Sequence, residues 1–255
     1  MADFQMMRED VSQCLRRMTE RSTGWFAAGI SRHFVSVPCP SCRSVEPAND
    51  FGICGECLRR LALNTAPYCP GCGGALDGVL AVCSKCVREE KAAWDGAVAA
   101  MRMEGLAREL IHRFKYQADT ALARPLGAAA AKAWLASGLS ADVLVPMPLH
   151  WTRLLCRGYN QCSLIARVIA ERTGIPMAPV LGRGRWSRPQ ASLGGMARRR
   201  NLADVFRVGD RAILEKRDIV VLDDVMTTGS TLRAACGALA DAGCGRIRIL
   251  VLARR

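Results

Sequence analysis

A predicted buried strand that ends in two adjacent aspartates and a hydroxyl-rich turn constrains the fold of this chain more than any other feature. The sequence reads VVLDDVMTTGST over Val220–Thr231. We expect Ile219–Leu222 to form the strand and Thr231–Ala242 to form a helix that ends at Gly243. Open parallel sheets bind ligands where the carboxyl end of a strand meets the next helix. The chain is therefore predicted to have an α/β fold with its main site at this junction.

The junction offers two kinds of chemistry side by side. Hydroxyls and closely spaced backbone amides come from Thr227, Thr228, Gly229, Ser230 and Thr231. Such a group at a helix N-terminus attracts a phosphate. The carboxylates of Asp223 and Asp224 would repel a phosphate, but they pair well with sugar hydroxyls or with Mg²⁺. The segment therefore indicates a ligand in which a phosphate and a ribose lie close together.

Two simpler interpretations of this segment fit less well. A nucleotide P-loop needs the pattern G-x-x-x-x-G-K-[ST], which the sequence does not have here. An acidic strand end followed by a Ser or Thr N-cap needs one capping residue, whereas four hydroxyl residues surround Gly229. We therefore favour a ligand site over a helix cap alone.

Eight of the 13 cysteines lie in four C-x-x-C pairs between residues 39 and 86. This spacing suits thiolates on one tetrahedral metal ion better than it suits a disulfide framework. The pairs predict two zinc sites in tandem. The first would use Cys39, Cys42, Cys54 and Cys57, and the second would use Cys69, Cys72, Cys83 and Cys86. A crossed arrangement, first pair with third and second with fourth, stays open. Four thiolates leave no open coordination position, so the metal would be structural.

Composition and periodicity divide the chain into three parts. Residues 1–37 form a leader that is predicted to be helical, either packed on the body or presented to a partner or a membrane surface. Residues 38–90 hold the cysteine pairs and cannot bury enough core without a metal. Residues 91–255 alternate strand and helix patterns. The further elements expected there are strands Asp95–Met103, Asp142–Pro146 and Ile247–Leu252, helix Ala121–Ser137, and a helix around Leu164–Ile169 that ends near Gly174.

The chain of 255 residues carries a formal net charge of +13. A basic balance favours anionic partners such as phosphates and nucleic acid, although a basic surface can also serve solubility alone. The sequence has no apolar run of about 18 residues, the length that a membrane-spanning helix needs. Residues 1–24 lack the apolar segment of a signal peptide. We therefore expect a cytoplasmic protein with reduced thiols.

Several motifs, in sequence order, resemble those of one known family. Val220–Thr231 is similar to the signature with which type I phosphoribosyltransferases bind 5-phosphoribosyl-1-pyrophosphate (PRPP). Three further segments resemble the ComF (GntX-like) family, the competence-associated proteins with an N-terminal double zinc ribbon. They are Val145–Trp151 followed by Arg153, Arg157–Gln161, and Arg188–Leu193 followed by Arg200. The resemblance covers about residues 38–255 and leaves the leader outside.

The resemblance implies a type I phosphoribosyltransferase-like domain over residues 91–255 and a double zinc-ribbon module over residues 38–90. Asp223 and Asp224 would hold the ribose hydroxyls. Thr227–Thr231, which follow Val225 and Met226 of the same signature, would cradle the 5-phosphate. The candidates for the pyrophosphate site and for the hood over it are Lys115, Pro146, Met147, Pro148, Arg153, Arg157, Gln190 and Arg200. Mg²⁺ would accompany PRPP.

Further basic residues have more than one interpretation. Arg183, Arg185, Arg188, Arg198, Arg199 and Arg200 gather around Trp186. Basic residues beside an aromatic ring can follow a single nucleic-acid strand, or they can cover pyrophosphate as part of the hood. His150, which follows the segment Pro146–Leu149, gives weak grounds for acid–base catalysis.

Three functions are consistent with these features. The resemblance implies a cytoplasmic PRPP-binding protein that supports the import of transforming single-stranded DNA in natural competence, with single-stranded DNA and competence machinery proteins as partners. The first alternative is an active phosphoribosyltransferase on an unknown base or amine, which would rely on charge stabilisation and closure of the hood. The second alternative is a sensor that binds a phosphoribosyl ligand without catalysis, because a fold does not settle activity.

Overall fold

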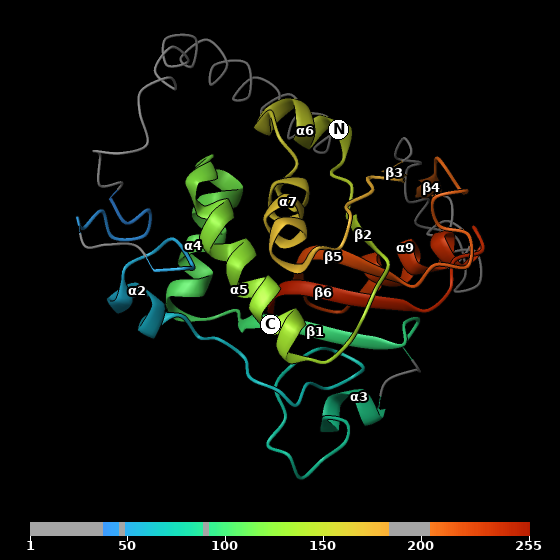
Figure 1. Ribbon diagram of the computed structural model, residues 1–255, viewed down its shortest axis with the longest axis horizontal. Helices are drawn as coiled ribbons and strands as arrows, with labels where there is room; N and C mark the ends of the chain where they lie inside the picture. The colour runs from blue at the N-terminus through green and yellow to red at the C-terminus, as the bar shows by residue number, and fades with distance from the viewer. Residues whose placement is uncertain (1–37, 46–48, 89–91, 184–204) are drawn as a thin grey trace, which may run out of the picture.

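The structure, a computed structural model, describes residues 38–45, 49–88, 92–183 and 205–255 (Figure 1). At its centre is a four-stranded sheet with the strand order β1-β6-β5-β2. All three strand pairs of this sheet are parallel. The strands are β1 (Gly96–Arg102), β2 (Val143–Pro146), β5 (Ile219–Met226) and β6 (Ile247–Arg254). The predicted α/β fold with a parallel sheet is confirmed.

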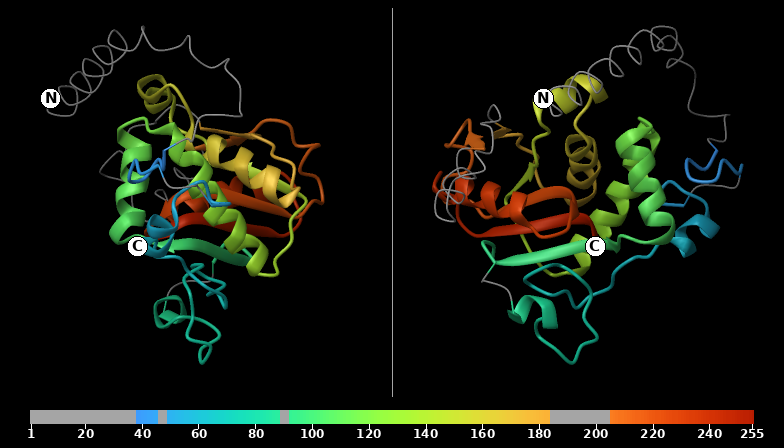
Figure 2. Two further views of the ribbon diagram at one scale, coloured as in Figure 1. Left: turned by 60° about the vertical axis from the view of Figure 1, so that its left-hand side comes forward. Right: turned by 180° about the vertical axis from the view of Figure 1, so that it is seen from behind.

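Helices cover both faces of this sheet. They are α4 (Gly105–Tyr116), α5 (Ala123–Ala136), α7 (Gln161–Thr173) and α9 (Ser230–Ala240), with a short 3₁₀ helix, η1 (Thr120–Leu122), before α5. Helices α5 and α7 pack on one face, and α9 packs on the other (Figures 1 and 2). Helix α7 begins at Asn160, whose side chain accepts a hydrogen bond from the Cys162 N–H, and it ends at Gly174 in the left-handed region. No helix within the described ranges has the length and apolarity that crossing a bilayer requires.

The central strand β5 is buried on both faces, which explains its continuous apolar sequence. Val220 and Leu222 belong to the apolar core that includes α5 and α7. Ile219 and Val221 belong to the core that includes α9. A shift of the strand by one residue would exchange these two sets, so packing on both faces fixes the register of β5 in the sheet.

Strand β5 is longer than the predicted strand Ile219–Leu222. Its backbone pairs with β6 as far as Met226, which lies opposite Arg254. Asp223 and Asp224 therefore belong to the strand itself, and the loop before α9 is correspondingly short. Because sheet hydrogen bonds hold their backbone, the two carboxylates project from a rigid element.

Three short elements complete the main part of the chain. Helix α6 (Trp151–Arg157) follows β2, and β3 (Leu181–Arg183) pairs with β4 (Phe206–Val208) in an antiparallel ribbon. The sequence analysis assigned none of these three, because elements this short carry too little periodicity to be recognised.

The cysteine-containing segment runs along the outer edge of β1. Helix α2 (Gly55–Arg60) packs beside α4, and α3 (Ser84–Arg88) lies beyond β1 (Figure 1). The Asn64 N–H donates to the Ala100 carbonyl (2.9 Å), and the Ala99 N–H donates to the Gly73 carbonyl (2.9 Å). These bonds occupy backbone groups that an uncovered edge strand would leave unpaired.

Candidate functional site

The carboxyl ends of β2 and β5 bring several of the predicted site residues together. The Met147 N–H, in the turn after β2, donates to the Leu222 carbonyl of β5 (2.8 Å). The Met147 carbonyl in turn accepts a hydrogen bond from the side-chain amide of Asn160 (3.0 Å). The turn Pro146–Pro148 is therefore fixed beside the end of β5, next to the two aspartates.

Asp223 and Asp224, hereafter the acidic pair, are only partly neutralised. Lys115 Nζ, from α4, lies 2.8 Å from Asp224 Oδ1. Asp223 Oδ1 accepts a hydrogen bond from the Asp224 N–H (2.8 Å), and the Cys162 Sγ lies 3.9 Å from the same oxygen. Burial and the neighbouring Asp224 carboxylate raise the pKa of Asp223 to about 7, although Lys115 acts in the opposite direction. Hydroxyl donors or a divalent cation would relieve this repulsion.

A short loop, Thr227–Gly229, joins β5 to α9 and is hereafter called the hydroxyl loop. Thr227 and Thr228 are exposed, and so is Ser230, the residue that follows the loop. Gly229 has a φ of 72° and is the N-cap of α9. A side chain at Gly229 would be strained at this φ, and a Cβ atom there would lie 3.2 Å from Trp94. The exposed hydroxyls and the N-terminal amides of α9 form a place where an anion can bind.

Basic side chains from α6 and β3 lie close to one another, and Arg183 of β3 also interacts with the Asp223 carboxylate. Burial and the charge of Arg153 lower the pKa of Arg183, while the Asp223 carboxylate acts in the opposite direction. Burial, followed by the charges of Arg183 and Arg153, also lowers the pKa of His150. His150 is therefore a neutral imidazole near neutral pH.

Two nitrogen atoms of this basic group, His150 Nε2 and Arg183 Nε, are buried and have no hydrogen-bond partner within the described part of the chain. His150 Nδ1 accepts a hydrogen bond from the Thr152 N–H (3.4 Å), and this bond assigns the ring proton to Nε2. Buried donors are rarely left unpaired in native proteins. Both N–H groups would be satisfied by an anionic oxygen of a ligand.

Other predicted site residues have different surroundings. The Arg157 guanidinium lies over the Tyr116 ring, 5.2 Å from its centroid. Met226 is buried in the core that includes α9, and Val225 packs against the opposite core. The side chains of Val225 and Met226 therefore serve packing. Gln190 and Arg200 lie outside the described residues, as do Arg185, Arg188, Arg198 and Arg199.

Sequence reasoning placed Arg183 among the arginines around Trp186 and gave little weight to His150. The structure instead places Arg183 on β3, close enough to Asp223 for the two charges to interact. No local pattern could have revealed this proximity, because it depends on how the β3–β4 ribbon packs. For His150, the available signal was its position directly after the turn Pro146–Pro148.

The eight paired cysteines form two clusters, and each cluster joins neighbouring pairs. In each cluster the sulfur atoms all lie within 4.8 Å of one another. The first cluster is Cys39, Cys42, Cys54 and Cys57, and the second is Cys69, Cys72, Cys83 and Cys86. This is the tandem arrangement and not the crossed one. The N–H groups of Cys54 and Cys83 donate to the sulfur atoms of Cys39 and Cys69 (3.4 Å each), as amides do towards thiolates. Four sulfur donors in a closed set fit a structural zinc ion.

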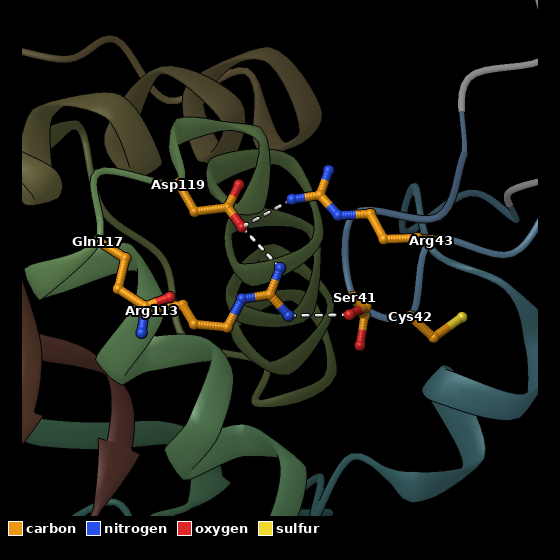
Figure 3. Close-up of a pocket in the computed structure, with 6 residues that line it drawn as sticks. All are labelled: Ser41, Cys42, Arg43, Arg113, Gln117 and Asp119. Atoms are coloured by element: carbon orange, nitrogen blue, oxygen red, sulfur yellow. Dashed lines mark hydrogen bonds and ion pairs between the residues drawn. The ribbon is translucent and has the colours of Figure 1, made fainter. Parts of the chain in front are cut away.

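A cavity of about 500 Å³ lies between the first cluster and α4 (Figure 3). It is lined by Ser41, Cys42, Arg43, Arg113, Gln117 and Asp119. Arg113 donates to the carbonyls of Pro40 and Ser41 and forms an ion pair with Asp119 (2.6 Å). Arg43 approaches the same carboxylate (3.7 Å). Arg113 and Asp119 are occupied by contacts that join the two walls, so the cavity is better explained as a joint between the first cluster and α4 than as a ligand site.

A parallel sheet with an acidic pair at the end of β5 and a hydroxyl-rich loop before the next helix defines a phosphoribosyltransferase-type domain, here joined to two four-cysteine clusters. The family described as "Phosphoribosyl transferase domain" matches residues 161–255. A solved structure of glutamine PRPP amidotransferase from Bacillus subtilis, complexed with ADP and GMP, is 23% identical, with a TM-score of 0.38. That match covers 50% of this chain and 25% of the other.

The chain belongs to the ComF family of competence proteins. It is 30% identical over 229 residues to Competence protein F of Haemophilus influenzae, a match that covers 87% of this chain and 99% of the relative. The DNA utilization protein YhgH of Escherichia coli K12 is 28% identical over 222 residues, covering 85% and 96%. Competence protein ComFC of Bacillus subtilis is 26% identical over 202 residues, covering 76% and 80%.

Proposed function

We propose that this protein binds PRPP with Mg²⁺ at the end of β5 and uses this site in the cytoplasm, during the import of transforming single-stranded DNA. The observation that carries the proposal is the position of the acidic pair directly before the exposed hydroxyl loop and the N-terminus of α9. One end of this arrangement suits a ribose, and the other suits its 5-phosphate. Relatives named for competence and DNA utilization support the cellular role.

Each part of the proposed ligand would meet a different set of residues. The ribose hydroxyls would donate to the acidic pair. The 5-phosphate would accept hydrogen bonds from amides and hydroxyls of Thr227–Thr231. The pyrophosphate would face the turn Pro146–Pro148, with positive charge from Arg153 and Arg183 and an N–H donor from His150. Mg²⁺ would neutralise the pyrophosphate, with its remaining ligands from water or the acidic pair.

Phosphoribosyl transfer is the second candidate function. Arg183 and the neutral His150 lie on the side where charge would develop on the departing pyrophosphate, so they could stabilise the transition state. The reaction would break the bond between C1 of the ribose and pyrophosphate and form a bond from C1 to the nitrogen of a base or amine. A ligand sensor without turnover would use the same binding residues and release no pyrophosphate.

The remainder of the chain supplies the proposed contact with nucleic acid. We propose that residues 38–90 act as a zinc-ribbon module beside the domain of residues 91–255. A net charge of +13 favours a polyanion such as single-stranded DNA. Competence machinery proteins are further proposed partners. The leader, residues 1–37, lies outside the described residues.

Calorimetric titration of the zinc-loaded protein with PRPP and Mg²⁺ tests the binding proposal. The variant Asp223→Ala/Asp224→Ala should bind at least about tenfold more weakly, because it loses both acceptors for the ribose hydroxyls. Asp241→Ala is the matched control, since Asp241 lies at the opposite end of α9, and it should bind like the wild type. Equal affinity in all three proteins, or no binding by the wild type, would contradict the proposal.

Two further measurements separate the candidate functions. Release of pyrophosphate from PRPP in the presence of bases or amines would establish transfer, and its absence would leave binding alone. Cells that carry the double variant in place of the wild type should lose transformation by external DNA. Normal transformation in those cells would show that ligand binding and competence are independent.

A further inference from the structure

The second cluster is packed directly against the sheet. Gly73, which follows Cys72, has a φ of 71°, and a Cβ atom there would lie 2.6 Å from Ala99 N. The Gly73 carbonyl accepts a hydrogen bond from the same Ala99 N–H (2.9 Å). Because no side chain fits between this turn and β1, the cluster has a fixed position on the strand.

Trp94 joins the second cluster to the hydroxyl loop. Its indole Nε1 donates to the carbonyl of Gly71, which lies in the turn of the third C-x-x-C pair (3.0 Å). The far edge of the ring reaches Gly229, where a Cβ atom would lie 3.2 Å from the Trp94 Cη2. Trp94 is 9% exposed. One buried indole therefore contacts both the metal-binding turn and the last residue of the loop.

Arg254, at the end of β6, holds the first residue of the hydroxyl loop from the sheet. Its Nη1 donates to the Thr227 carbonyl (2.8 Å). The guanidinium thus ties the end of β6, which pairs with β1 and β5, to the backbone of the hydroxyl loop.

Arg233 adds a third contact on the same side of the loop. Its Nη2 donates to the Thr228 carbonyl (2.7 Å). Its guanidinium lies 5.8 Å from the centroid of the Trp94 ring, within the range of a cation–π interaction. Trp94, which contacts the second cluster through Gly71, therefore also supports Arg233. Arg233 in turn holds the middle of the hydroxyl loop.

These contacts determine where the amides of the loop point. In a planar trans peptide the C=O and N–H groups point in opposite directions. The carbonyls of Thr227 and Thr228 are held by Arg254 and Arg233, respectively. The N–H groups of Thr228 and Gly229, which share those peptides, consequently point away from these two guanidinium groups. An anion at the N-terminus of α9 needs outward N–H groups of this kind.

We propose that the second cluster, when it holds its metal ion, sets the conformation of the hydroxyl loop through Trp94 and through Arg233, which packs on the Trp94 ring. Trp94 and the two arginines that hold the loop act as positioning residues for the phosphate of the ligand. The identity of that ligand rests on the proposed function, but the contacts between the second cluster and the hydroxyl loop do not depend on it. The first cluster provides an internal comparison. It belongs to the other apolar core, with α4 and α5, and its turn is held by Arg113.

Hydrogen exchange at the Thr228, Gly229 and Ser230 amides tests the link without any ligand. The variants Cys83→Ser and Cys42→Ser each remove one thiolate, from the second and the first cluster respectively. We expect Cys83→Ser to accelerate exchange at the loop amides by about tenfold or more and Cys42→Ser by less than about twofold. Measurement of the metal content of each variant confirms that it has lost one ion. Equal exchange in the two variants would show that the second cluster has no special effect on the loop.

Variants that keep both ions separate positioning from folding. Trp94→Phe removes the hydrogen bond to Gly71, and Arg254→Met removes the one to Thr227. Both should retain their metal content, accelerate exchange at the loop amides, and weaken the binding of ribose 5-phosphate by about tenfold, while Arg254→Lys should recover part of that loss. Unchanged exchange in Trp94→Phe would overturn the proposal. If the wild type binds no phosphoribosyl ligand, the proposed function fails. The exchange data would still decide whether the second cluster sets the conformation of the loop.

Linkage requires the reverse effect as well, because ligand and metal would favour the same conformation of the loop. Saturating PRPP should raise the affinity of the second cluster for zinc, measured by competition with a chelator, and should leave the first cluster unchanged. An equal change at both clusters, or at neither, would contradict the coupling in a wild-type protein that binds PRPP.

Discussion

Lys115 Nζ lies 2.8 Å from Asp224 Oδ1, so helix α4 brings a cation to the carboxylates at the end of β5. The two side chains are 17% and 22% exposed, so water screens the pair only in part. The same ammonium group also opposes the rise in the pKa of Asp223 that burial and Asp224 cause. Helix α4 thus influences the protonation state of the site as well as packing on the core.

Replacing Lys115 with Met should change the pH dependence of ligand binding. Without the ammonium group, the pKa of Asp223 rises above about 7, so Asp223 keeps its proton to higher pH and accepts hydroxyl donors less well. The midpoint of the pH dependence of PRPP affinity should move up by roughly 0.5–1 pH unit. Calorimetry across this pH range measures the shift.

Lys132→Met is the control for this change of charge. Lys132 lies on α5, with its Nζ 5.4 Å from the centroid of the Phe51 ring, and its loss should leave the midpoint where it is in the wild type. A midpoint that moves down in Lys115→Met, or that moves equally in both variants, would contradict the role assigned to Lys115.

The raised pKa of Asp223 predicts that the acidic pair reduces the stability of the fold. A carboxyl with a pKa of about 7 in the folded state, against an ordinary value of 3.8, binds its proton more tightly when folded. Wild-type stability therefore falls as the pH rises from about 4 to about 7, and it stays reduced above that range. Asp223→Asn keeps an Oδ1 acceptor for the Asp224 N–H but carries no charge.

This variant should increase the free energy of unfolding at about pH 8 by roughly 2 kcal/mol. The gain should shrink as the pH falls towards about 4, because the wild-type carboxyl is then protonated in the folded state and partly protonated in the unfolded state. Urea denaturation of the zinc-loaded proteins at the two pH values measures the difference. A gain of the same size at both pH values would contradict the raised pKa of Asp223. The same variant should lose PRPP affinity, so that stability and binding change in opposite directions.

Gly229, the N-cap of α9, and Gly237, within α9, make a matched pair of sites for testing the conformation of the hydroxyl loop. Gly229→Ala places a side chain at a φ of 72° and brings a Cβ atom 3.2 Å from Trp94. It should lower stability by about 1–2 kcal/mol and weaken phosphate binding. Gly237 lies within the same helix, and a Cβ atom there meets no atom within 4 Å. Gly237→Ala should raise stability by about 0.5–1 kcal/mol. Thermal unfolding of both variants checks the two signs, and a stable Gly229→Ala protein with normal binding would contradict the constraint on the loop.

The candidate site could be located from the sequence because its signals are local. The apolar run Ile219–Leu222, the acidic pair and Gly229 lie within one strand–loop–helix unit, and each has a direct meaning for backbone conformation or ligand chemistry. The C-x-x-C spacing is equally local, since two thiolates on one turn reach the same metal ion. The tandem grouping of the pairs needed the structure, because spacing alone allowed two solutions.

Contacts between distant segments could not be predicted in this way. Trp94 reads as an isolated aromatic residue, and only the docking of the second cluster on β1 brings its indole to Gly71 and Gly229. The positive charge of Arg183 likewise interacts with the Asp223 carboxylate because the β3–β4 ribbon brings Arg183 close to the end of β5. Such relations depend on which surfaces pack together, and a single sequence does not specify that pairing.

Arg183 offers a test that distinguishes the pyrophosphate end of the proposed site from its phosphate end. The Arg183 guanidinium is partly buried near Asp223, and its Nε has no hydrogen-bond partner among the described residues. Arg183→Met should weaken the binding of PRPP by about tenfold or more, because it removes a cation that would face pyrophosphate in the proposed site. Ribose 5-phosphate has no pyrophosphate, so its affinity should change by less than about twofold. Arg157→Met, which removes the guanidinium over Tyr116, controls for the loss of one positive charge. If Arg183→Met weakens both ligands equally, then Arg183 shapes the site as a whole and does not bind pyrophosphate.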